Sequence, residues 1–159
     1  MFGIYQPDAI ASFIGADSKQ YYVIANEGDD RDDFLDPNET TTVGNANYTL
    51  DPSLSDTLKT KSELGRLTVS NVGAGSTNPN ITQLRGDTDG DGDIDQIISY
   101  GGRSFSILND KGEIVFDSGT HTEQVVAATG LSSAGGNYDD GRSDNKGTEP
   151  EGITVGTIN

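Results

Sequence analysis

The sequence predicts a mainly β fold of antiparallel meanders, with long acidic loops and one or two short helices. Only 31% of the 159 residues are hydrophobic, and 21 residues are glycine. Tyrosine and phenylalanine lie mostly in short β-like runs, and polar turn sequences separate these runs. This profile does not fit a helical bundle, whereas the chain length suits one modest domain with a core of its own.

The N-terminal part predicts a β-hairpin. Residues 9–14 and 20–25 have the composition of two strands, and residues 15–19 have that of a turn. The polar residues 26–31 are expected to break the second strand. Further along, residues 66–72 alternate like a strand. A helix is predicted at 54–64, because Leu54, Leu58 and Leu64 fall near one face and Gly65 can end it.

The centre of the chain predicts a three-stranded meander. Its strands are expected at 96–100, 103–108 and 113–117, with a tight turn at 109–112. The strand spacing suits a sandwich or a propeller, and we expect residues 1–159 to form a single unit. The remaining segments are predicted as a short helix at 122–129, a strand starting at 153–155, and long loops at 30–53, 73–86 and 132–152.

The charge balance indicates a cation as the partner. The chain carries 26 acidic and 10 basic residues, a formal net charge of −16. This excess argues against nucleic acids and anionic membranes, both of which require basic residues. A solvated acidic surface is the alternative explanation for much of the charge.

Several functional classes are excluded by composition. The chain has no cysteine and a single histidine, His121, so it cannot form a disulfide scaffold, a thiolate site or a multi-histidine zinc centre. No segment is long and apolar enough to span a membrane. The N-terminus lacks the features of a signal peptide, so any export signal is expected outside this chain.

The aspartate-rich segment at 87–95 predicts a calcium site. Asp87, Asp89 and Asp91 alternate along it, and Gly92 allows a sharp turn after them. Asp93 can offer its carbonyl oxygen, and Asp95 can bind directly or through water. Five carboxylates within nine residues repel one another unless a cation is bound, and magnesium fits less well because it keeps its waters. The alternative is a solvated acidic turn.

The segment is not an EF-hand. An EF-hand needs a bidentate glutamate at the twelfth position, where this chain has Ile98. The residues that follow are β-like instead of helical. A missing ligand is therefore expected from elsewhere in the chain or from water, and Ile94 is expected to anchor the loop in the core.

Other acidic clusters are more ambiguous. Acidic residues from Glu27 to Asp33, Asp29 among them, surround Arg31 and suit either a second cation site or a solvated loop. Glu149 and Glu151 lie two apart on a segment stiffened by proline, which suits either a metal centre or a plain turn. Arg103 follows two glycines and could face an anion such as phosphate, although a structural ion pair is the favoured interpretation.

Several segments in the same order resemble the choice-of-anchor I domain family. They are residues 6–13, 22–29, 64–67, 86–93, 100–107 and 143–153. The resemblance implies a secreted or surface-anchored β-propeller that depends on metal and is often described as alkaline-phosphatase-like. A chain of this length would supply about two blades, so we expect it to be completed by the rest of a larger propeller or by other chains.

Two functions follow as hypotheses. The first is a calcium-binding extracellular propeller segment with a structural or binding role at the cell surface. The second is a calcium-dependent phosphomonoesterase, in which metal at Glu27, Asp29, Glu149 and Glu151 would polarise the phosphate and Arg103 would hold it. The first is preferred, because the sequence offers no convincing nucleophile or general base.

Overall fold

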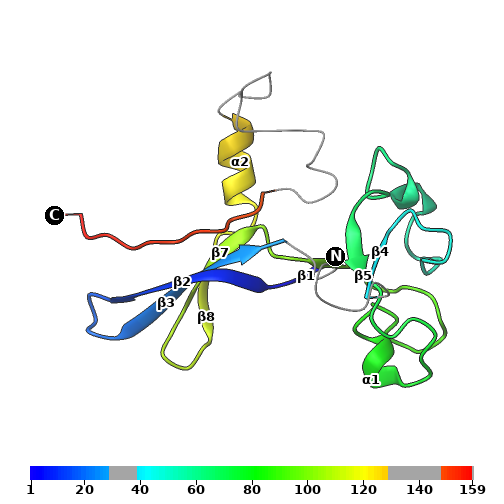
Figure 1. Cartoon of the computed structure of the whole chain (residues 1–159), viewed down its shortest axis with the longest axis horizontal. Helices are drawn as coiled ribbons and strands as arrows, with labels where there is room; N and C mark the ends of the chain where they lie inside the picture. The colour runs from blue at the N-terminus through cyan, green and yellow to red at the C-terminus, as the bar shows by residue number, and fades with distance from the viewer. Residues whose placement is uncertain (29–38, 129–147, 159) are drawn as a thin grey trace. The chain divides into compact units, whose positions relative to one another are not determined.

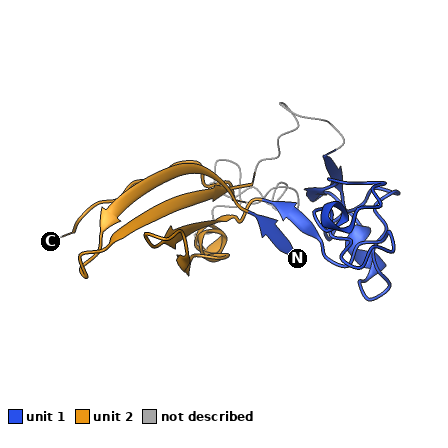
Figure 2. Cartoon of the chain, turned by 90° about the horizontal axis from the view of Figure 1, so that it is seen from below, with its two compact units in different colours: residues 1–4, 29–100, 140–146 blue, residues 5–28, 101–139, 147–159 orange. Residues whose placement is uncertain are grey.

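Two four-stranded sheets form the framework of the described residues (Figure 1). The computed structural model describes residues 1–28, 39–128 and 148–158. The chain divides into two compact units, coloured separately in Figure 2. Unit 1 comprises residues 1–4, 29–100 and 140–146, and unit 2 comprises the rest. The fold is mainly β, as predicted.

Unit 2 contains the sheet β2-β3-β7-β8, in which every neighbouring pair is antiparallel. Its strands are β2 (Gln6–Ile14), β3 (Gln20–Glu27), β7 (Ser104–Leu108) and β8 (Ile114–Asp117). The predicted hairpins β2–β3 and β7–β8 are both confirmed. The strand β3 runs two residues further than predicted, since Asn26 pairs with Ser104 in register and its side chain donates hydrogen bonds to Ser104 and Ser106.

Unit 1 contains the sheet β1-β6-β5-β4. Its strands are β1 (Phe2–Ile4), β4 (Thr40–Thr42), β5 (Thr68–Ser70) and β6 (Ile98–Tyr100). The β1–β6 pair is parallel, and the other two pairs are antiparallel. The predicted three-stranded meander is therefore wrong in one strand. β6 pairs with β1 and β5 instead of β7, because long-range pairing competes with adjacency in sequence.

The hydrophobic core of unit 1 draws on a segment that we predicted as a surface loop. Val43, Tyr48 and Leu50, from the 30–53 segment, are buried with Leu67 and Val69 of the β5 region. Ile94 and Ile97 complete this cluster, so Ile94 does anchor the aspartate loop. Residues 29–38 of the predicted loop lie outside the described residues.

Two of the predicted local elements differ from the structure. Residues 54–64 form only a short 3₁₀ turn, η1 (Asp56–Lys59), which Ser55 caps and Thr60 ends in an extended conformation. Hydroxyl bonds such as Thr60 Oγ1 to the Thr57 carbonyl compete with a longer helix. Leu54, Leu58 and Leu64 still pack against the core, as their spacing suggested. The strand predicted from 153 is not formed.

The helices are short. The helix α2 (His121–Ala128) confirms the one predicted at 122–129. A four-residue helix, α1 (Pro79–Thr82), interrupts the loop predicted at 73–86. Of the loop predicted at 132–152, residues 132–147 lie outside the described residues, and 148–152 have no regular structure. In the part of the chain that the structure describes, no helix has the length and apolar character to cross a membrane.

Candidate metal centre

The aspartate loop lies between α1 and β6 and is closed at its base by Gly86. The Gly86 carbonyl accepts hydrogen bonds from the backbone N–H groups of Asp95 and Gln96, both at 3.0 Å. Gly86 has a φ of 105°, and a Cβ at this position would collide with the Gln96 carbonyl oxygen. Only glycine therefore allows the two ends of the loop to approach so closely.

Inside the loop, Asp87 organises the turn. It is 4% exposed, and its two carboxylate oxygens accept from the N–H groups of Gly90 at 2.7 Å and Gly92 at 3.2 Å. Gly90 and Gly92 have φ values of 85° and 103°, which the left-handed region permits most easily for glycine. The alternation of aspartate and glycine is thus what lets the backbone curl around Asp87.

The next two aspartates repeat a local turn. Asp89 Oδ1 accepts from the Asp91 N–H at 3.2 Å, and Asp91 Oδ1 accepts from the Asp93 N–H at 3.1 Å. Asp95 Oδ2 closes the loop by accepting from both the backbone and the hydroxyl of Thr88, at 2.7 and 2.9 Å. These bonds hold the side chains of the loop in fixed directions without a basic residue.

A sixth carboxylate, that of Asp51, joins the loop from a distant segment. Leu50 and Ile94 form an isolated parallel bridge, in which the Ile94 N–H donates to the Thr49 carbonyl and the Asp51 N–H to that of Ile94. Leu50 and Ile94 are buried in the core. Their neighbours project to the opposite side, because adjacent residues of extended chain face opposite ways. Asp51 is thereby placed beside Asp93 and Asp95.

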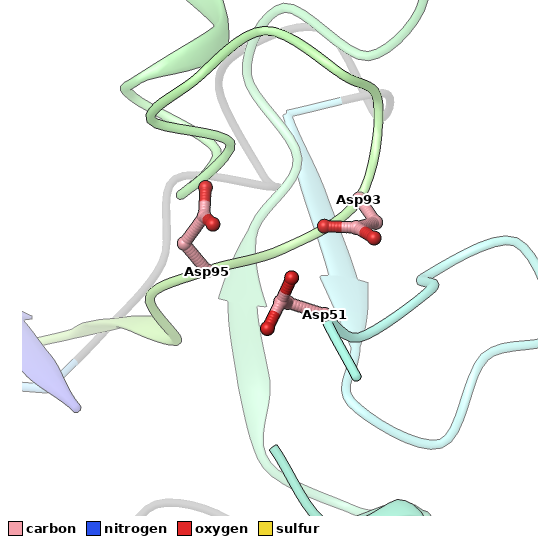
Figure 3. Close-up of side chains that lie close together, drawn as sticks. All are labelled: Asp51, Asp93 and Asp95. Carbon is pink, nitrogen blue, oxygen red and sulfur yellow. The ribbon is translucent and has the colours of Figure 1, made fainter. Parts of the chain in front are cut away.

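Two groups of carboxylates result. Asp51, Asp93 and Asp95 have ligand oxygens within 4.8 Å of one another, and Figure 3 shows these three side chains. Asp87, Asp89 and Asp95 form a second group, with carboxylate oxygens also within 4.8 Å of one another. Asp95 belongs to both. Carboxylates of four of the five predicted residues thus gather in groups, Asp93 through its side chain instead of the carbonyl oxygen expected of it. Asp91 belongs to neither group, and its Oδ1 accepts from the Asp93 backbone N–H.

Asp93 and Asp95, two residues apart in the loop, have different electrostatic surroundings. Burial, together with the negative charges of Asp91 and Asp51, raises the pKa of Asp93 to about 6. Its Oδ1 is enclosed and has no hydrogen-bond partner. The pKa of Asp95 is lowered, chiefly because its carboxylate accepts from the Thr88 backbone and hydroxyl. The surroundings of Asp93 therefore disfavour its ionised form, whereas those of Asp95 favour it.

The chemistry of the two groups suits a hard divalent cation. Every ligand atom is a carboxylate oxygen, which Ca²⁺ prefers and softer metals do not. No ion pair in the described part of the chain neutralises these six aspartates. The enclosed Asp93 Oδ1 has no hydrogen-bond donor, and a bound cation would supply the partner that this oxygen lacks. The residues present therefore fit calcium.

Sequence reasoning missed Asp51. Its local sequence, Leu-Asp-Pro, resembles an ordinary turn, and its Oδ1 does accept from the Ser53 N–H at 2.7 Å. Only the pairing of Leu50 with Ile94 brings it to the loop. The sequence did indicate a missing ligand, to be supplied from elsewhere in the chain or by water, because Ile98 stands at the twelfth position; in the structure Ile98 lies in β6.

The second predicted cluster is only partly visible. Glu27 ends β3 and is half-buried, Glu149 is half-buried and Glu151 is exposed. Asp29 lies outside the described residues. None of these three described glutamates belongs to a group of three or more clustered carboxylates or histidines among the described residues.

Arg103 takes the structural role that its sequence context favoured. Its Nη1 lies 3.2 Å from Glu123 Oε1 of α2, and both side chains are about three-quarters buried, at 25% and 24% exposure. Its carbonyl accepts from the Thr122 hydroxyl at 3.0 Å. The guanidinium thus holds the start of α2 beside β7.

The fold and the acidic loop define a class of protein: a mainly β, strongly acidic chain in which carboxylates from two segments of the chain gather at one loop. The chain belongs to the choice-of-anchor I domain family, whose model matches residues 1–159. The family description indicates a surface-associated domain. Neither a curated protein nor a solved structure matches the chain significantly.

Proposed function

We propose that this chain is a calcium-binding domain of a cell-surface or extracellular protein. In this proposal Ca²⁺ has a structural role and stabilises a surface for binding other molecules. The ion would be held by Asp51, Asp93 and Asp95, with Asp87 and Asp89 next to them. The convergence of Asp51 on the loop is the observation that carries the proposal, because it supplies the ligand that an interrupted EF-like loop lacks.

The proposed ion would join two parts of unit 1. Asp51 belongs to the segment that contributes Tyr48 and Leu50 to the core, and Asp93 and Asp95 flank the buried Ile94. A cation shared by these carboxylates would replace mutual repulsion by attraction to one centre. The expected consequence is a rigid loop and a more stable unit 1 when calcium is present. Extracellular calcium modules commonly bind with dissociation constants of roughly 10⁻⁴–10⁻³ M.

Two expectations are separate from this proposal. One is a propeller completed by further blades or by other chains, and the other is the phosphomonoesterase activity that accompanies the family resemblance. No observation favours the enzyme in particular. Arg103, the residue suggested to hold phosphate, is engaged by Glu123. A structural calcium role requires only the carboxylates that converge in unit 1.

Isothermal titration of the metal-free chain with CaCl₂ tests the proposal directly. We expect saturable binding of Ca²⁺, and weaker binding of Mg²⁺ because Mg²⁺ keeps its waters and demands stricter geometry. Asp51→Asn should weaken calcium binding, and the matched control Asp110→Asn, at an exposed turn of unit 2, should not. A melting temperature that is the same in CaCl₂ and in EGTA would refute a structural calcium role.

A further inference from the structure

A polar pocket of about 430 Å³ opens in unit 1, formed by residues other than the aspartates of the metal centre. The described residues of its walls are three asparagines, two threonines, Arg85 and the small residues Ala74 and Gly75. The volume falls in the range of roughly 300–1,000 Å³ typical of small-ligand sites. Such sites are usually apolar, so a pocket with this lining suits a polar ligand.

Arg85 is held in one orientation at this pocket. Its Nε donates to Asn71 Oδ1 at 3.0 Å and its Nη2 donates to the Asn47 carbonyl at 2.9 Å. The guanidinium carbon lies 5.5 Å from the ring centroid of Tyr48, which is fully buried. The side chain is thus preorganised, and little of its conformational entropy remains to be lost on binding.

The fixed side chain leaves one edge of the guanidinium open. The protein acceptors occupy Nε and one Nη2 hydrogen, and Arg85 makes no other polar bond with the described residues. The outer edge, with hydrogens on both Nη atoms, has the fork geometry that binds an oxyanion through two parallel hydrogen bonds. A planar carboxylate matches this edge.

The charge around the pocket also favours an anion. The chain has 26 acidic residues, yet among the described residues that line this pocket none is acidic and one is cationic. The side chain of Asn45 adds to the donors, because its Oδ1 already accepts from the Asn47 N–H at 2.9 Å and its amide N–H groups remain. A pocket whose described walls are rich in donors and hold no carboxylate, in a strongly acidic protein, selects for an acceptor-rich ligand.

We propose that this pocket binds a carboxylated sugar, a hexuronic acid, with its carboxylate on the outer edge of Arg85. The side-chain amides of Asn45 and Asn47 and the hydroxyl of Thr41 would pair with the sugar hydroxyls. This ligand combines the planar anion that the guanidinium fits with the neutral polar groups that asparagine and threonine fit. The site is independent of the metal centre proposed above.

Titration of the calcium-saturated chain with galacturonate, followed by NMR chemical shifts, tests this site. Galactose and inorganic phosphate serve as parallel probes. We expect saturable binding of galacturonate, with shifts at Asn45, Asn47 and Arg85, and much weaker binding of both other probes. If galactose binds as tightly as galacturonate, or if phosphate alone binds, the assignment to a sugar acid is overturned. The absence of saturable galacturonate binding overturns it as well.

Asn45→Asp is the decisive variant. It keeps the oxygen that accepts from Asn47, so the turn is preserved, but it places a negative charge in the pocket. We expect affinity for galacturonate to fall by at least about tenfold, because like charges brought together at a binding site oppose association. Arg85→Gln should lower it further, but this change also removes the contact with Tyr48 and so is the less clean variant.

Asn78→Asp is the matched control. Asn78 Oδ1 accepts from the backbone N–H two residues later, as Asn45 Oδ1 does, and Asn78 does not line the pocket. The control adds the same charge to unit 1 and should bind galacturonate like the wild-type chain. Equal binding by Asn45→Asp and wild type, or an equal loss in both variants, would exclude the proposed site.

Discussion

Replacing Asp51 with asparagine should change stability in opposite directions with and without calcium. The asparagine keeps an oxygen for the Ser53 N–H, so the local turn is preserved. Without calcium, the change removes one of the negative charges that raise the pKa of Asp93. The metal-free variant should therefore melt at the same temperature as the wild-type chain or higher.

With calcium, the same variant should melt lower. A ligand at 100 times its dissociation constant stabilises the folded state by about 2.7 kcal/mol, and a tenfold weaker affinity at the same concentration leaves about 1.4 kcal/mol. For a chain of this size, 1 kcal/mol shifts the melting temperature by about 2–4 °C. A tenfold loss of affinity would thus reduce the calcium-induced increase by about 3–5 °C, as measured by differential scanning calorimetry.

The control for this experiment is Asp110→Asn, which should respond to calcium as the wild-type chain does. The reasoning fails if Asp51→Asn retains the full calcium-induced increase. It also fails if the metal-free variant is clearly less stable than metal-free wild type, because Asp51 would then stabilise the fold by itself.

Two further changes probe the aspartate loop of unit 1 and the polar interior of unit 2. Gly86→Ala should destabilise unit 1 by more than about 2 kcal/mol and weaken calcium binding, because Gly86 has a φ of 105° and the added Cβ would collide with the Gln96 carbonyl. The control Gly90→Ala, where the added Cβ meets no other atom, should cost only about 1–2 kcal/mol. Denaturant titrations measure both free energies of unfolding. Ser106→Ala removes a buried hydroxyl that donates to Asp117 at 2.5 Å and should cost about 1–3 kcal/mol at pH 7. Burial raises the pKa of Asp117, but its hydrogen bonds, that from Ser106 first, lower the pKa by more, so the pKa is lowered overall. The stability that the ionised Asp117 provides is therefore present above about pH 4 and is lost as pH falls through the folded-state pKa. The variant should therefore lose less stability than wild type on acidification below pH 4, and an unchanged difference between them at all pH values would count against this role of Ser106.

Local sequence predicted the parts of the fold that depend on neighbours in the chain. The two hairpins of unit 2 and α2 are confirmed, because turn residues and alternation act over a few positions. The helix predicted at 54–64 was wrong in type but right about which leucines face the core. There the hydrophobic spacing was informative, whereas the hydroxyl groups of Ser55 and Thr60 decided the backbone.

Pairing between distant segments could not be predicted in this way. The placement of β6 beside β1 and β5, and the burial of Val43, Tyr48 and Leu50 in a segment rich in polar residues, both depend on partners far along the chain. A strand of three residues carries too little pattern to identify its neighbour.

The acidic composition, the aspartate–glycine alternation and the absence of an EF-hand glutamate are properties of the sequence, and they were sufficient to predict a cation loop that needs an outside ligand. Which carboxylate joins the loop from outside was decided by tertiary structure. Asp51 reaches Asp93 and Asp95 only because Leu50 and Ile94 are buried side by side, and burying two large aliphatic side chains fixes where the polar neighbours on the opposite side must lie. The same long-range packing positions Arg85 over Tyr48 and forms the pocket beside Arg85. No local sequence pattern predicts this pocket.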